Sequence, residues 1–198
     1  MAQGFTLFDT AIGTCAIAWG ERGIVAAQLP DKDDTQIRTR MRKRFPNAPE
    51  SEPPTEMRSA IDGIVALMRG EKRDLLEVTL DMGGIPDFHR RIYEVARAIP
   101  PGQTLTYGEV AEKLNAPSAA RAVGQALGAN PIPIIVPCHR ILAASGKTGG
   151  FSAPGGTSTK MRMLTIEGAK VNQAPSLFDQ LPLAARPRRS RTTPDRRR

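Results

Sequence analysis

The first thirty residues consist of short apolar runs separated by turns that contain glycine, a pattern typical of antiparallel strands. Two such runs, Thr14–Trp19 and Gly23–Leu29, flank the segment Gly20-Glu21-Arg22-Gly23, which favours a tight hairpin. We therefore expect strands within residues 4–30. A later apolar run, Leu76–Leu80, is expected to form a closing strand.

Two amphipathic helices are predicted between these runs. The polar segment Asp33–Phe45 carries an apolar residue at every fourth position, and Pro46–Pro54 then interrupts the pattern. A second helical pattern leads up to Gly70, and its apolar residues are Met57, Ile61, Ile64, Val65 and Met68. Residues 1–82 are thus expected to form a small α/β domain.

Helical signals dominate from Gly84 onward, where a mainly α domain spanning residues 84–172 is predicted. The apolar residues Phe88, Ile92, Val95 and Ile99 lie at helical spacing, and Pro100-Pro101-Gly102 ends that helix. Thr106 and Glu109 match the capping box that starts another helix.

A short turn, Asn115-Ala116-Pro117, follows, and Ser118 is expected to cap a further helix from Ala119 to Leu127 that Gly128 closes. Two short helices joined by a tight turn have the outline of a helix-turn-helix. The second of them is rich in alanine and glycine, and Arg121 is nearly the only long side chain in its first turn. This composition suits either close packing of two helices or close approach to DNA.

The run from Asn130 to Arg140 contains the most distinctive chemistry. Its three prolines are expected to hold the backbone extended, and its apolar residues to bury it, so that Cys138 is presented at the edge of the core. A thiol reacts as the thiolate, which a nearby imidazole such as that of His139 favours. A lone cysteine in an apolar run is also compatible with an inert core residue.

A glycine-rich loop, residues 146–156, follows this run, and it can present backbone amides and the ring of Phe151 to a flat ligand. A plain surface connection has the same composition. Beyond the loop, apolar spacing around Met163 predicts a last helix that contains Lys160 and Glu167 and ends at Gly168.

The net charge of +8 is distributed unevenly. Residues 173–198 contain seven arginines and two aspartates, so this segment is +5 and the rest of the chain only +3. Its lack of apolar periodicity predicts a disordered basic tail that binds polyanions loosely. A small apolar island within it, which includes Phe178, is a possible docking element.

Other features of the sequence narrow the class of protein. The chain has two cysteines, Cys15 and Cys138, which predicts free thiols in a reducing cytosol. The N-terminus lacks the pattern of a secretory signal, and no apolar run is long enough for a membrane helix. We therefore expect a cytoplasmic protein that does not interact with membranes. We also expect it to be a monomer. The histidines and cysteines lack zinc-type spacing, so neither a metal nor another cofactor is expected.

Four features follow one another in this part of the chain: the small-residue helix, the Asn-Pro corner, the motif Ile135-Val136-Pro137-Cys138-His139-Arg140-Ile141-Leu142 and the glycine-rich loop. In this order they resemble the O6-alkylguanine-DNA alkyltransferase family, also called methylated-DNA–protein-cysteine methyltransferases. The resemblance covers roughly residues 84–172, and the Cys138 motif is highly specific for the family. It implies irreversible transfer of an alkyl group from guanine O6 in double-stranded DNA to a cysteine of the protein, without turnover.

The resemblance also implies a role for each matching residue. Cys138 would be the alkyl acceptor, His139 would take its proton through a bound water, Glu167 would orient the imidazole, and Asn130 would brace the turn around the site. On the DNA side, four residues are implied. Tyr107 would face the target nucleotide, Arg121 would fill the space left by the flipped guanine, Phe151 would line the base pocket, and Ser152 would read O6 with its backbone amide.

The sequence departs from the family pattern at three places. Phe151 stands where some members have tyrosine, which removes one hydroxyl contact. The loop from Phe151 to Gly156 is longer than in some relatives, and Gly128 replaces a basic residue of others. These departures leave open how strictly the base and the size of the alkyl group are selected.

Two other functions fit part of the pattern. A DNA-binding sensor of alkylated bases would lack chemistry, and members of that kind lack the acceptor cysteine that is present here as Cys138. A Cys/His hydrolase or thiol-redox enzyme would turn over a small substrate, but the sequence has neither a CxxC motif nor a second cysteine near Cys138.

Overall fold

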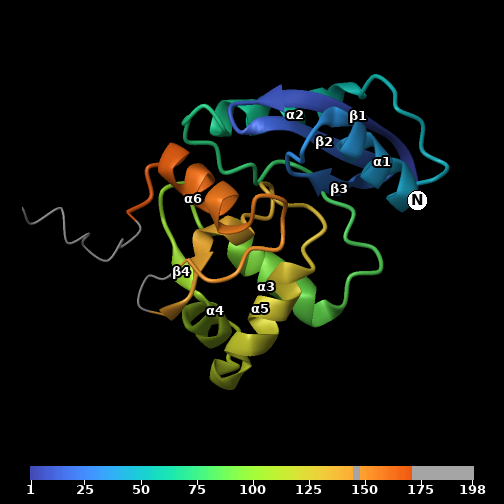
Figure 1. The fold of residues 1–198 in the computed structure, drawn as a ribbon. Coiled ribbons are helices and arrows are strands. Elements are labelled where there is room, and N and C mark those ends of the chain that lie inside the picture. Colours follow the sequence, from blue (N-terminus) through green and yellow to red (C-terminus); the bar gives the residue numbers. More distant parts are fainter. Residues whose placement is uncertain (145–147, 171–198) are drawn as a thin grey trace, which may run out of the picture.

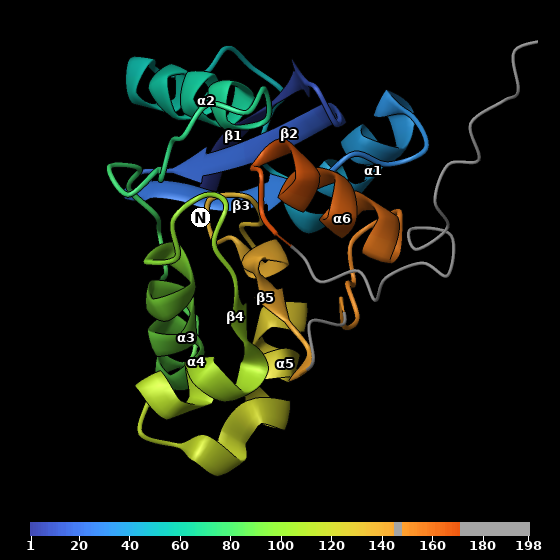
Figure 2. The same ribbon diagram turned by 90° about the vertical axis from the view of Figure 1, so that its left-hand side faces the viewer.

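The computed structural model describes residues 1–144 and 148–170, which form a mixed α/β fold (Figure 1). A three-stranded sheet with two helices makes up the N-terminal part. Below it in the same view lie the helices α3, α4 and α5. The helix α6 comes last in the described chain and lies between these two groups, as the view turned by 90° also shows (Figure 2).

The sheet is an antiparallel meander in the order β1-β2-β3, built from Ala2–Thr10, Gly13–Gly20 and Gly23–Gln28. Gly20 pairs with Gly23 across the expected hairpin. Alternate residues of β2 point to opposite faces. Ala16 and Ala18 pack with α1, whereas Ile17 and Trp19 pack in the cluster that contains α2. Both faces are covered at β2 and β3, so these two strands consist of nearly continuous apolar runs.

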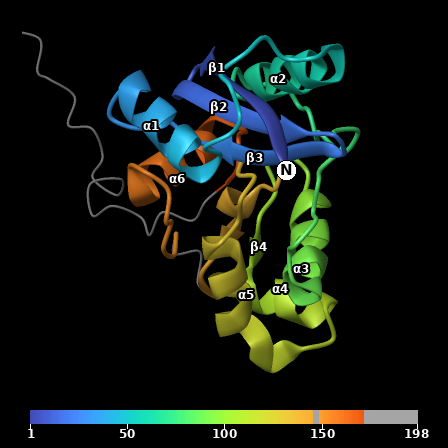
Figure 3. The same ribbon diagram turned by 90° about the vertical axis from the view of Figure 1, so that its right-hand side faces the viewer.

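The two helices of the N-terminal part fall where the spacing predicted them. Helix α1, Asp34–Arg44, is capped by the side chain of Asp33, and helix α2 spans Thr55–Leu67. They lie on opposite faces of the sheet (Figure 3). The prediction of a closing strand at Leu76–Leu80 is wrong. Leu80 forms only an isolated bridge with Ile24, and Leu76 is exposed, because Leu75 adopts a left-handed conformation that turns the chain.

The helical part begins with α3, Asp87–Arg97, and continues through the short strand β4, Leu105–Thr106, into α4, Tyr107–Lys113. The predicted capping box is formed. The Thr106 hydroxyl accepts from the Glu109 amide at 3.2 Å, and the Glu109 carboxylate accepts from the Thr106 amide at 2.6 Å. It fixes where α4 begins.

The next helix begins differently from the prediction. Pro117–Ala119 form a 3₁₀ turn, and α5 spans Ala120–Gly128 with Ala119 at its N-cap position. Ser118 therefore does not cap this helix, because the proline continues directly into helical turns and places Ser118 inside them. Gly128 is the last residue of α5 and not the stop beyond it.

The segment between α5 and Cys138 is buried as expected but is not extended. Ile134 has a left-handed backbone (φ 74°), and the amide of Val136 donates to the carbonyl of Ile132 at 2.9 Å, so the chain folds back on itself. The expectation of an extended run is wrong because its prolines stand at 131, 133 and 137 and leave Ile134 free to turn. Asn130 supplies the bonds that support the turn.

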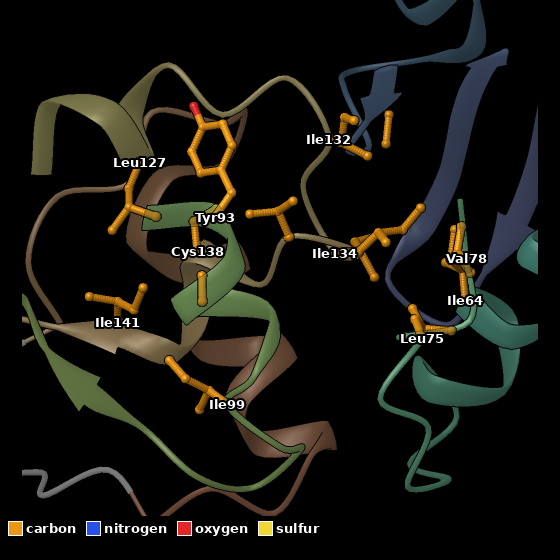
Figure 4. Packing of buried hydrophobic residues seen from close by; sticks show 14 of the residues in the cluster. Ile64, Leu75, Val78, Tyr93, Ile99, Leu127, Ile132, Ile134, Cys138 and Ile141 are labelled. Atoms are coloured by element: carbon orange, nitrogen blue, oxygen red, sulfur yellow. The ribbon is translucent and has the colours of Figure 1, made fainter. Parts of the chain in front are cut away.

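After this turn, Cys138–Arg140 form a 3₁₀ turn, and Ile141–Leu142 form β5, which pairs in parallel with β4. The last helix, α6, spans Gly156–Ile166, and Gly168 follows it in a left-handed conformation. Ile132 and Ile134 lie between the residues around Cys138 and the apolar residues Ile64, Leu75 and Val78 of the N-terminal part (Figure 4). One apolar core therefore connects both parts.

Within residues 1–144 and 148–170, no helix is both long and apolar enough to cross a bilayer. The predicted tail, 173–198, and the beginning of the glycine-rich loop, residues 146 and 147, lie outside the described residues.

Candidate functional site

Cys138 lies at the first position of the 3₁₀ turn Cys138–Arg140 and is 9% exposed. Its neighbours in the core are Tyr93 of α3, Leu127 of α5 and Ile141 of β5 (Figure 4). Burial raises the pKa of the Cys138 thiol, and the nearby Asn130 side chain and Lys160 ammonium oppose that effect. Formation of a thiolate here at neutral pH would therefore need a group that helps to remove the proton.

Two clefts reach Cys138. One of about 460 Å³ opens along α4 and α5 and is lined by Tyr107, Gly124, Leu127, Gly128, Cys138, Gly150, Phe151 and Ser152. The other, of about 170 Å³, lies against the N-terminal part, where Leu29 of β3 and Arg44 of α1 contribute to its wall. Leu127 of α5 lines both clefts, but only the first cleft is also lined by α4, through Tyr107, and its size suits a flat heterocycle.

The side chains of His139, the residue after Cys138, and Glu167 contact each other. The His139 Nε2 atom lies 2.9 Å from Glu167 Oε1, and both side chains are fully buried. Within residues 1–144 and 148–170, no protein group bonds to His139 Nδ1, although that atom is buried. When Nε2 donates to the carboxylate, Nδ1 carries a lone pair and is able to accept a proton.

The charge states of this pair follow from their surroundings. Burial alone would raise the pKa of Glu167, but hydrogen bonds and charge from His139 and Arg140 outweigh it and bring the pKa to about 2. Burial lowers the pKa of His139, and Glu167 only partly offsets that effect. The arrangement therefore favours an ionised carboxylate beside a neutral imidazole.

Lys160 of α6 is a buried cation near the thiol. Its Nζ atom donates to the Ile141 carbonyl at 2.5 Å and lies 6.0 Å from the centre of the Tyr107 ring. Burial lowers the pKa of Lys160 to about 8, and the charge of Cys138 opposes the shift. An ammonium in this position favours the thiolate.

Asn130 follows directly after α5 and spans the turn that leads to Cys138. Its side-chain amide donates to the Val136 carbonyl at 2.9 Å, and its side-chain oxygen accepts from the Ile132 amide at 3.0 Å. These two bonds close the turn on both sides, so the position of the cysteine depends on Asn130.

The remaining predicted site residues divide into two groups. Tyr107, at the start of α4, Phe151 and Ser152 line the cleft above Cys138, and the Ser152 hydroxyl donates to the Gly128 carbonyl at 3.0 Å. Arg121 lies exposed on the first turn of α5 and is not among the residues that line either cleft. The structure thus brings the other predicted residues together around Cys138 and leaves Arg121 apart on the outer surface.

Cys15, the second cysteine, lies in β2 and is 1% exposed. Burial raises its pKa to about 12, against a weak contact with the Thr10 hydroxyl. It is a thiol of the sheet core, as the strand pattern predicted.

Three residues near Cys138 were not identified from the sequence: Tyr93, Arg140 and Lys160. The Tyr93 hydroxyl donates to the Ala126 carbonyl at 2.8 Å and so ties α3 to α5 beside the cysteine. A signal was available for Lys160, which lies at helical spacing with the buried Met163, Leu164 and Glu167. A charged residue on the apolar face of a helix is a candidate for a buried ionic site.

Comparisons with known proteins identify close relatives. Residues 87–169 match the family described as 6-O-methylguanine DNA methyltransferase, DNA binding domain. The chain is 43% identical over 126 residues to the methylated-DNA–protein-cysteine methyltransferase of Mycobacterium tuberculosis, a match covering 64% of this chain and 74% of that protein. It is 34% identical over 155 residues to the protein of the same name from Methanothermobacter thermautotrophicus, covering 78% and 80% of the two chains.

A solved structure gives the same result. The crystal structure of Mycobacterium tuberculosis OGT in complex with DNA superposes with a TM-score of 0.64 and 32% sequence identity, over 83% of this chain and 92% of that one. The likeness extends beyond the helical part, because it covers more of the chain than residues 87–169 alone.

Proposed function

Because this chain belongs to the methylated-DNA–protein-cysteine methyltransferase family, we propose that Cys138 is its alkyl acceptor and that guanine O6 is the atom it dealkylates. The protein repairs alkylated DNA by direct transfer of the alkyl group to a cysteine. The observation that carries the assignment to Cys138 is its place in the lining of the cleft beside α4 and α5. The only other cysteine in the sequence, Cys15, is enclosed by the sheet.

His139 acts as the general base. Its Nδ1 atom takes the proton of the Cys138 thiol through a water molecule, and Glu167 holds the ring by accepting from Nε2. The raised pKa of the thiol supports this role, because few thiolates form unaided at neutral pH. The lowered pKa of His139 keeps the imidazole neutral and ready to accept.

The transfer is an in-line displacement at the alkyl carbon. A sulfur electron pair forms the new S–C bond while the C–O6 bond breaks and its electrons pass to the guanine. The guanine then takes up one proton, equal to the one that left the thiol, so the products are an S-alkylcysteine and unmodified guanine. The neutral thioether is a poor alkyl donor, because reversal would have to expel the sulfur as a thiolate. Each molecule therefore reacts once.

The helices α4 and α5 bind the DNA as a helix-turn-helix, with the small residues of α5 close to the duplex. The reacting O6 atom is hidden in the base stack, so the nucleotide must be flipped out at a cost of a few kcal/mol. Arg121 offsets this cost by filling the space in the duplex, which suits its exposed position on α5. Tyr107, Phe151 and Ser152 receive the base in the cleft above Cys138.

We assign DNA binding and alkyl transfer to residues 84–172 and a supporting role to residues 1–82. The protein acts as a monomer. The shared apolar core is consistent with the supporting role, because the buried Ile132 and Ile134 pack the turn before Cys138 against the N-terminal part. The basic segment 173–198 adds loose, salt-sensitive attraction to DNA.

Incubation with a duplex that carries a labelled O6-methylguanine tests the proposal. One equivalent of label bound per protein molecule is the expected result. Binding of the duplex without any label on the protein would identify a sensor instead, and release of label through many cycles would identify a turnover enzyme.

A further inference from the structure

All three guanidinium nitrogens of Arg140 donate hydrogen bonds to buried groups near Cys138. Its Nε and Nη2 atoms donate to Glu167 Oε2 and Oε1 at 2.8 and 2.9 Å, and Nη1 donates to the Ile99 carbonyl at 2.5 Å. The arginine side chain is 1% exposed and the glutamate side chain is fully buried. A two-point contact of this kind fixes both the position and the plane of the carboxylate.

The backbone around Glu167 is held from other directions as well. Gly102, in the turn after α3, has a positive φ, and a Cβ there would lie only 2.9 Å from the Glu167 carbonyl oxygen. Arg140 bonds to Ile99 just before that same turn. The end of α3, the Cys138–Arg140 turn and the end of α6 therefore meet at Glu167.

The carboxylate oxygen nearest the imidazole is shared. Glu167 Oε1 accepts from Arg140 Nη2 and lies at the same 2.9 Å from His139 Nε2. An ionised carboxylate only accepts hydrogen bonds, so the proton of the imidazole must stay on Nε2 and the lone pair on Nδ1. A protonated Glu167 could donate to Nε2 and would select the opposite tautomer, with the lone pair on Nε2 facing Glu167 and the proton on Nδ1.

We propose that Arg140 is a positioning residue for alkyl transfer, which holds the Glu167 carboxylate ionised against His139 and so fixes the imidazole tautomer that accepts the proton of Cys138. The inference rests on the proposed role of Cys138 and assigns no contact between Arg140 and the substrate. The charged groups that act on His139 are Arg140 in its own turn, Lys160 of α6, and Glu167 at the end of α6. Tyr93 of α3 packs in the same cluster as the neighbouring Cys138.

The charge of Arg140 also acts on the imidazole directly. Arg140 and Lys160 lower the pKa of His139, whereas Glu167 raises it. Removing Arg140 leaves His139 as the nearest counter-charge to a buried carboxylate, so the imidazole pKa must rise. Because the base works only when it is neutral, the acidic side of the pH–rate profile must move to higher pH.

The test compares Arg140→Met with the wild-type chain in two measurements. The single-turnover rate of transfer from O6-methylguanine duplex is measured against pH, and the His139 imidazole is titrated by NMR without DNA. The sequence has only two histidines, His89 and His139, so the spectrum is simple to assign. We expect the acidic limb and the His139 titration to move upward together, with about a tenfold loss of rate on the acidic side for every pH unit that the limb moves.

Arg97→Met is the matched control. Arg97 is a partly buried arginine that donates to the carbonyls of Leu75, Leu76 and Val78. Its loss should lower the stability without moving either pH curve. Arg140→Lys keeps the charge but not the two-point contact, and it should move both curves in the same direction as Arg140→Met but less far. It also serves as the test variant if Arg140→Met does not fold.

Unchanged pH curves in the folded Arg140 variants would overturn the inference, even if their rates were uniformly lower. Loss of a purely structural arginine would lower the rate by the same factor at every pH and would not move the acidic limb of the pH–rate profile. The NMR titration needs no alkyl transfer. If the wild-type chain failed to take up an alkyl group while the His139 titration still moved as expected, the proposed function would fail and the effect of Arg140 on the imidazole would stand.

Discussion

The Nε2 atom of His139 lies 2.9 Å from the Oε1 atom of Glu167, and neither side chain is accessible to solvent. The two positions are 28 residues apart along the chain. They meet only because the C-terminal end of α6 packs against the Cys138–Arg140 turn. The contact leaves Nδ1 of the imidazole available to accept a proton. In the proposed mechanism, the reactivity of the site therefore depends on the ionisation of the buried Glu167 carboxylate.

Acid should destabilise the protein through Glu167. Its pKa is about 2 in the folded protein against an ordinary 4.5, so the folded state binds fewer protons than the unfolded state between these values. The stability from the ionised carboxylate is therefore complete above pH 4.5 and is lost as the pH falls toward 2, an effect of about 3 kcal/mol. Chemical denaturation as a function of pH measures it.

The matching variant for this effect is Glu167→Gln, which leaves Arg140 buried without its counter-charge. It should be less stable than wild type by about 3 kcal/mol at neutral pH, and the difference should shrink below pH 4.5. A difference that stays constant down to the acid transition would show that Glu167 does not titrate as described.

Replacement of His139 by alanine should slow transfer at neutral pH by about a hundredfold or more, because the buried Cys138 thiol ionises poorly without a base. The rate of this variant should recover as the pH rises toward the raised pKa of the thiol. Single-turnover rates across the pH range give the answer. A variant rate equal to that of wild type at neutral pH would remove His139 from the mechanism.

Lys160→Met should slow transfer by about tenfold below pH 8, since the ammonium near Cys138 favours the thiolate. The pKa of Lys160 is about 8, so its charge, and with it the difference between the two rates, should disappear as the pH rises above that value. Methionine fills a similar volume and limits damage to the packing. A ratio of rates that does not depend on pH would point to a structural effect alone.

Arg121→Ala should slow the repair of duplex DNA by at least about tenfold and leave the reaction with a free O6-alkylguanine base nearly unchanged, because only the duplex requires base flipping. Arg58→Ala is a suitable control. It removes the same charge from an exposed position on α2, in the N-terminal part of the chain. Equal slowing of both substrates by Arg121→Ala would argue against a role in flipping.

Features with a local cause could be predicted from the sequence. The capping box of Thr106 and Glu109 and the hairpin between Gly20 and Gly23 each depend on residues a few positions apart. The Cys138 motif likewise points to a candidate acceptor cysteine without any structure, and its role stays a prediction. Its buried surroundings follow from the apolar run that precedes it.

Features that depend on tertiary packing could not be predicted. The run before Cys138 folds back at Ile134, a conformation that its prolines did not indicate and that the Asn130 side chain supports. No short-range sequence pattern predicts that Arg140 bonds to Glu167 or that Lys160 lies near the Cys138 thiol. The expected strand at Leu76–Leu80 failed because Leu76 is exposed, Val78 reaches the core from an irregular loop, and only Leu80 forms a bridge with the sheet.

The central claim is that the sulfur of Cys138 receives the alkyl group. Mass spectrometry of peptides from the protein, after reaction with excess O6-methylguanine duplex, tests it directly. We predict one added methyl group on the peptide that contains Cys138, none on the peptide that contains Cys15, and no transfer by Cys138→Ala although Cys15→Ala reacts normally. A methyl group on any other residue, or transfer that persists in Cys138→Ala, would contradict the account.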